Sequence, residues 1–141
     1  MSKKSGKSKS EAAKAEPRKA KGGGPVADDA VKVTFLGGLG EIGRNCACVE
    51  VDGKIILIDC GLMFPDANMH GIDLILPDFT YLRENATRIQ ALVLTHGHED
   101  HVGAIQYLLR DHDGIGDLRD EPLPIYGAAL TLGLARNRID A

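Results

Sequence analysis

The chain has 141 residues, of which 43% are hydrophobic, so it is long enough for one small domain with an apolar core. The formal net charge of -3 is unevenly spread, because residues 1–24 carry eight Lys and Arg against two Glu, and the remainder carries nine basic against eighteen acidic side chains. The odd number of cysteines, three, and the lack of a CxxC pair argue against a disulfide framework. The sequence shows neither a secretory signal nor an apolar stretch long enough to span a membrane, so a cytoplasmic protein is expected.

The first residues have the composition of a disordered basic tail. Residues 1–29 are mainly Lys, Ser, Ala and Gly, with no aromatic residue and no β-branched residue before Val26. Such a segment cannot bury enough apolar surface to offset the entropy of ordering it. The tail is interpreted either as a non-specific contact for RNA phosphates or as a solubilising extension.

Three strands are predicted in the first half of the chain. Residues 31–36 alternate apolar and polar side chains, and residues 46–51 and 54–59 form a hairpin through the turn Asp52-Gly53. Residues 55–58 are expected to be buried on both faces. Cys46 and Cys48 share one face of their strand and are interpreted as buried small apolar residues, not as a thiolate site.

A loop with four glycines, at residues 37–45, separates the first two strands. Its spacing matches neither a dinucleotide-binding fingerprint nor a P-loop. Two interpretations stay open: the glycines only permit a tight turn, or the loop also lines a site with main-chain N–H groups.

Helices and strands alternate in the second half. A short helix at 81–89 precedes a strand at 91–94, a helix begins at His101, a strand follows at 124–126, and a helix closes the chain at 128–139. This order predicts an α/β or α+β protein with a mixed β-sheet, flanking helices and layered sheets.

The strongest chemical signal is a cluster of ligand-type side chains directly after the strand at 91–94. His96 and His98 are two residues apart in an extended turn, so both rings can reach one metal ion, and Asp100 and His101 can diverge toward a second ion. The alternative is a polar loop of hydrogen-bonded histidines, which would be the better reading for a lone His. Zinc is expected from the ligand types, with manganese as the alternative.

Other polar residues have two readings each. Asp59 ends a strand, where a carboxylate either orients a ligand histidine from behind or caps the strand end. Glu99 lies between the ligands and either accepts a hydrogen bond behind them or faces solvent. His70 and His112 are isolated and are interpreted as surface or capping residues.

These motifs resemble those of metallo-β-lactamase-fold hydrolases, whose HxHxDH signature is present as His96, His98, Asp100 and His101, with Asp59 at the position of an earlier strand-end aspartate. The segments GGLGEIGRN, IDCGLMFPD, GIDLILPDFTYL, LTHGHEDHVGAI and PIYGAALTLGL resemble the ribonuclease J family in order and spacing. The resemblance covers residues 31–140.

The resemblance implies a two-zinc ribonuclease of the β-CASP group, acting on RNA 5′-to-3′ and internally in rRNA processing and mRNA decay, and usually a homo-oligomer. It implies that His96 and His98 hold one zinc, and that Asp100 and His101 hold the other together with the attacking water. Gly71 and Asp73 match positions where relatives bind a structural calcium.

The family takes further ligands, a histidine for each metal and a bridging aspartate, from beyond Ala141. Residues 30–141 are therefore expected to be the N-terminal part of a metallo-β-lactamase domain, inactive or nearly so alone. The alternatives are another hydrolase of this fold, acting on a thioester or a lactam, and a catalytically incomplete RNA-binding module.

Overall fold

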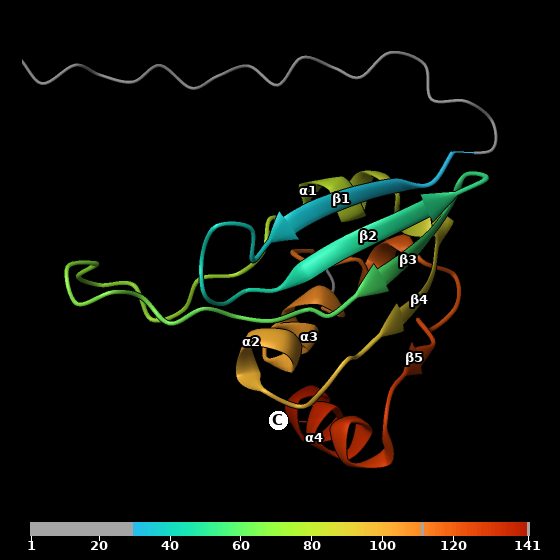
Figure 1. Ribbon diagram of the computed structural model, residues 1–141. Helices are drawn as coiled ribbons and strands as arrows, with labels where there is room; N and C mark the ends of the chain where they lie inside the picture. Colours follow the sequence, from blue (N-terminus) through green and yellow to red (C-terminus); the bar gives the residue numbers. More distant parts are fainter. Residues whose placement is uncertain (1–29, 111, 141) are drawn as a thin grey trace, which may run out of the picture.

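The computed structural model describes residues 30–110 and 112–140 (Figure 1), so the basic tail predicted for residues 1–29 lies outside the described part. Five strands form one mixed sheet in the order β1-β2-β3-β4-β5. The strands are β1 Lys32–Gly37, β2 Cys46–Val51, β3 Lys54–Ile58, β4 Ile89–Val93 and β5 Ile125–Tyr126. The helices are α1 Thr80–Glu84, α2 Glu99–Val102, α3 Ile105–Leu108 and α4 Ala129–Ile139, with 3-10 turns η1 Ala86–Arg88 and η2 Gly116–Leu118. The predicted mixed sheet with flanking helices is confirmed.

The β2–β3 hairpin turns as its sequence predicts. Asp52 and Gly53 both have positive φ, 47° and 73°, as a two-residue hairpin turn requires. Strands β1, β2 and β3 pair antiparallel, whereas β4 and β5 pair parallel to their neighbours. The parallel pairing matters for the site, because parallel strands end at the same edge of a sheet.

One face of the sheet is buried and the other is open. Ile55 and Leu57 of β3 are fully buried in a core that also takes in α1, α3 and α4, but Ile56 between them is 43% exposed. The prediction that this strand is buried on both faces is therefore wrong. The expected second sheet layer is not found among the described residues, and the outer face, which includes Phe35 and Val93, stays in contact with solvent.

Two of the predicted helices are shorter than the sequence pattern suggests. The helix expected from His101 begins at Glu99 and is interrupted after Val102, because the amide of Ala104 leaves the helix and donates to the Cys60 carbonyl at 3.0 Å. The helix expected at 81–89 ends at Glu84. Residues 86–88 form a separate 3-10 turn, and Ile89 already belongs to β4.

The cysteines pack as small apolar side chains. Cys46 and Cys48 are 2% and 1% exposed and Cys60 is fully buried, which confirms the interpretation of the first two. Burial raises the pKa of the Cys48 thiol to about 12. Within the described residues, no helix combines the length and the apolar character needed to cross a membrane.

Candidate metal centre

The candidate site lies where β3 and β4 end side by side. Asp59 directly follows β3, and its amide donates to the Val93 carbonyl at the end of β4 at 2.9 Å. The chain after β4 then runs through Thr95 and His96 to α2, which begins at Glu99. Residues 42 positions apart in the chain, Asp59 and His101, are thereby brought into contact.

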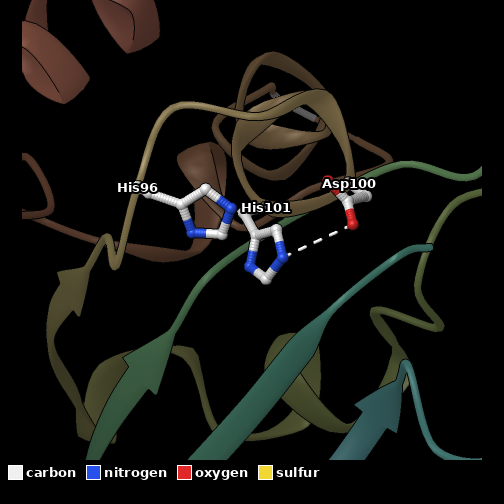
Figure 2. A group of neighbouring side chains, drawn as sticks. All are labelled: His96, Asp100 and His101. Carbon is white, nitrogen blue, oxygen red and sulfur yellow. Dashed lines mark ion pairs between the residues drawn. The ribbon is translucent and has the colours of Figure 1, made fainter. Parts of the chain in front are cut away.

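Three of the four predicted ligands form one tight group (Figure 2). Each of His96, Asp100 and His101 offers a ligand atom within 4.8 Å of the others. The ring centroids of His96 and His101 are 4.0 Å apart. His98 is not part of this group, although its ring packs edge-on against His96 with centroids 4.6 Å apart. The division of the ligands between two ions stays a prediction.

Asp59 fixes the proton positions on two of the rings. Its Oδ1 accepts the Thr95 amide at 2.8 Å, and its Oδ2 accepts the Thr95 hydroxyl at 2.8 Å and the His101 Nδ1–H at 2.7 Å. A hydroxyl has one hydrogen, so Thr95 Oγ1 must accept from His96 Nδ1, which lies 3.0 Å away. Both imidazoles therefore carry a proton on Nδ1, and in their neutral form they leave a lone pair on Nε2.

These lone pairs make the group suitable for a cation. His101 Nε2 lies 3.4 Å from Asp100 Oδ2, the contact dashed in Figure 2, and in the neutral ring with Nδ1 protonated both atoms are acceptors that face each other. Two facing acceptors repel unless a positive charge or a donor lies between them. Imidazole nitrogen and carboxylate oxygen are the ligand atoms that Zn²⁺ and Mn²⁺ accept in proteins, so the residues present fit a divalent metal.

Asn45 and Gly61 shape the site but were not singled out from the sequence. The amide side chain of Asn45 donates to the Asp100 carbonyl at 3.0 Å, and its main-chain N–H donates to the same oxygen at 2.9 Å. A Cβ on Gly61 would lie 1.6 Å from that oxygen, so only glycine allows α2 to approach so closely. No local sequence pattern marks Asn45 or Gly61, because the residue that both contact, Asp100, is about 40 to 55 positions further along the chain.

The glycine-rich loop is braced by its own side chains. Glu41 accepts the Gly38 amide at 2.9 Å and the Arg44 Nε–H at 2.6 Å. The hydrogen bond from Arg44 and the one from Gly38 hold the pKa of Glu41 below its usual range. The loop exposes Leu39 and Ile42 to solvent.

The remaining predicted residues lie outside the cluster. Glu99 forms an ion pair with Arg138 of α4. Gly71, with φ 80°, and Asp73 are exposed on the loop after β3, and Asp73 belongs to no group of three potential ligands among the described residues. The calcium assignment stays a prediction. His70 is exposed, as expected, and so is His112, which lies 3.9 Å from Asp117.

Comparisons with known proteins bear on the same segment. Residues 39–131 match the family described as the Metallo-beta-lactamase superfamily. The chain is 46% identical over 112 residues to Ribonuclease J of Synechocystis sp., which covers 79% of this chain and 16% of that protein. It is 44% identical over 124 residues to Ribonuclease J of Thermus thermophilus, covering 88% of this chain and 21% of that protein. The chain thus spans about a fifth of the length of these relatives. The solved structure of human tRNase Z, short form, aligns with a TM-score of 0.42 at 24% identity, covering 74% of this chain and 37% of that chain.

Proposed function

The chain belongs to the metallo-beta-lactamase superfamily, and from this membership we propose that it supplies part of the metal centre of a ribonuclease. The observation that carries the proposal is the approach of His101 Nε2 to Asp100 Oδ2, 3.4 Å apart, beside His96. The resemblance to ribonuclease J agrees with relatives of that name at 40–46% identity, and it supports RNA as the substrate.

In this proposal His96 and His98 hold one zinc ion, and Asp100 and His101 hold the second. Manganese is the alternative metal for such a mixed set of ligands. When bound, the metal supplies Lewis acidity, which lowers the pKa of water and neutralises charge on a phosphodiester under attack. Gly71 and Asp73 are retained as a proposed calcium site.

The chain's own residues prepare this site in two ways. Asp59 and Thr95 keep a proton on Nδ1 of both rings, so that in the neutral rings Nε2 is the nitrogen that presents a lone pair. Asp59 is 5% exposed, so its hydrogen bonds are shielded from competing water. This arrangement favours the reading of Asp59 as a residue that orients a ligand.

The whole protein is proposed to cleave RNA 5′-to-3′ and internally, in the cytoplasm, as a homo-oligomer. Residues 30–141 would then form part of a metallo-β-lactamase domain, and the other ligands of the two ions would come from elsewhere. The 141-residue chain alone is expected to show little or no cleavage, because the ions would keep incomplete protein coordination.

Zinc titration of the metal-free chain tests this proposal. The chain is expected to take up zinc, and His96→Ala and His101→Ala are each expected to weaken binding at least about tenfold, because each removes a ligand. His112→Ala is the matched control, since His112 is exposed and outside the cluster. Equal zinc affinity in all four proteins would refute the metal site.

RNA assays separate the alternatives. Turnover of a thioester or a lactam without RNA cleavage would favour another hydrolase of this fold. RNA binding that survives replacement of His96, His98, Asp100 and His101 by Ala would favour a binding module. Cleavage of 5′-monophosphorylated RNA by this chain, lost in His98→Ala, would contradict its expected inactivity and would require ligands from a partner.

A further inference from the structure

Asn45 is the residue through which the glycine-rich loop touches the candidate metal centre. It lies at the end of that loop, directly before β2, and its carbonyl accepts the Gly61 amide at 2.9 Å. Its side-chain nitrogen lies 3.0 Å from the Asp100 carbonyl, 3.3 Å from Asp100 Oδ2 and 3.3 Å from His101 Nε2. One amide group therefore reaches both facing acceptors of the site.

The hydrogens of this amide can be counted against its acceptors. The nitrogen has two hydrogens, and the shortest contact, to the Asp100 carbonyl, takes one of them. The second hydrogen is left for Asp100 Oδ2 and His101 Nε2 together, at equal and longer distances. Because those two atoms are only 3.4 Å apart, this hydrogen supplies the positive end of a dipole where the two lone pairs converge.

We infer that Asn45 is a positioning residue of the metal centre, whose side-chain amide holds Asp100 Oδ2 and His101 Nε2 together until a divalent cation takes the place of its shared hydrogen. The inference rests on the proposed metal site. The short bond to the Asp100 carbonyl does not involve a ligand atom, so it persists when the ion binds. The two long bonds are the ones that the ion replaces.

The consequence is a site that is gathered before the metal arrives. Without the amide, Asp100 would lose its anchor at the main-chain carbonyl, the two ligand atoms would rotate apart, and an ion would have to collect them. The bond to the Asp100 carbonyl stays in place beside the bound ion, and outer hydrogen-bond partners of this kind commonly account for 10- to 100-fold in metal affinity. Asn45→Ala is therefore expected to weaken zinc binding by about tenfold.

A second variant has the opposite effect on the metal. Asn45→Asp is nearly isosteric but replaces the donor with a carboxylate beside Asp100. In the metal-free chain the two carboxylates repel, which lowers the thermal unfolding midpoint. With zinc present the added negative charge lies close to the ion, so Asn45→Asp is expected to bind zinc more tightly than the unsubstituted chain.

The experiment is a zinc titration of the full chain against a chromophoric chelator, with circular dichroism to check folding and to follow thermal unfolding. Asn85→Ala is the matched control, because Asn85 also makes two side-chain hydrogen bonds, to the Tyr81 carbonyl at 2.8 Å and from Arg88 at 2.6 Å, in a different part of the fold. It is expected to lower stability and to leave zinc affinity unchanged.

Weaker zinc binding by Asn45→Ala together with tighter binding by Asn45→Asp supports the inference. If both variants lower stability as Asn85→Ala does and bind zinc like the unsubstituted chain, Asn45 only anchors the fold and the inference is overturned, while the metal site stands. If Asn45→Ala does not fold, Asn45→Asp decides alone. An unsubstituted chain that takes up no zinc overturns the inference and the proposed metal site together.

Discussion

Asp59→Asn is expected to reverse the proton positions on two histidines with little change in the fold. The amide oxygen keeps the place of Oδ1 and accepts the Thr95 N–H, so the NH₂ group takes the place of Oδ2. One of its hydrogens then donates to Thr95 Oγ1 and the other to His101 Nδ1, which must become an acceptor. The Thr95 hydroxyl is freed to donate to His96 Nδ1. Both rings therefore carry their proton on Nε2, the atom needed for the metal.

The magnitude follows from the same hydrogen bonds. Each group that contacts Asp59 or Thr95 in this network keeps a partner after the rearrangement, and asparagine tolerates the positive φ of this position, 59°. The free energy of unfolding is therefore expected to change by less than about 1.5 kcal/mol. To bind an ion, each ring must return its proton to Nδ1, where the His101 N–H faces an N–H of the new amide and the His96 N–H faces the Thr95 hydroxyl hydrogen, at a cost of about 1–3 kcal/mol each. At 1.4 kcal/mol per factor of ten, zinc affinity is expected to fall on the order of 10- to 100-fold per ring.

Nitrogen NMR of the imidazoles reports the proton positions, and the chelator competition reports the affinity. Asp78→Asn is the control, since Asp78 is exposed and accepts the Thr80 amide at 2.9 Å, a role that an amide oxygen also fills. The reasoning is refuted if the rings keep their proton on Nδ1 and zinc affinity is unchanged. A loss of stability above about 3 kcal/mol would equally show that the network does not rearrange as argued.

Three further predictions concern the fold around the site. Gly61→Ala is expected to lower the free energy of unfolding in urea by about 3 kcal/mol or more, because the added Cβ would lie 1.6 Å from a main-chain oxygen of α2. A decrease of less than about 1 kcal/mol would show that the backbone adjusts freely. The hydrogen bond from Tyr81 holds the pKa of Glu50 below its usual range, so this carboxylate stabilises the fold above its unfolded-state pKa and the stabilisation is lost as the pH falls through the lower folded value. Between about pH 5 and pH 3, the thermal unfolding midpoint of Glu50→Gln is therefore expected to fall less steeply than that of the unsubstituted chain. Parallel plots of midpoint against pH for the two proteins would contradict this. Leu57→Ala is expected to lower the free energy of unfolding by about 3 kcal/mol and Ile56→Thr by less than about 1 kcal/mol, since Leu57 is fully buried and Ile56 is 43% exposed. Equal decreases would mean that the outer face of the sheet is covered in solution.

The open sheet face explains one wrong prediction. The sequence of β3 is continuously apolar, which is the usual mark of a strand buried on both faces. Burial depends on what packs against each face, and the described residues cover only one of them. Hydrophobicity alone therefore could not distinguish a face that is covered here from one that is not.

The sequence by itself determined what depends on neighbouring residues. The hairpin at Asp52 and Gly53 follows from the backbone preferences of two adjacent residues. The closeness of the ligand-type residues follows from their separation by at most five positions, although the sequence paired His96 with His98, whereas the structure groups His96 with Asp100 and His101. These features are local, so short-range sterics and spacing are sufficient to predict them.

Only the tertiary structure decided which distant residues complete the site. Asp59 meets the ligands because β3 pairs parallel with β4 and both strands end at the same edge, and Asn45 meets them because β2, antiparallel to β3, begins at that edge. Residues 36 to 56 positions apart are thereby brought together. A contact between the same segments interrupts the helix at Ala104, because the Ala104 amide donates to the Cys60 carbonyl and not to a carbonyl of its own helix. The physical reason is that strand register and main-chain hydrogen bonding between separate segments are properties of the assembled sheet, and no window of the sequence contains them.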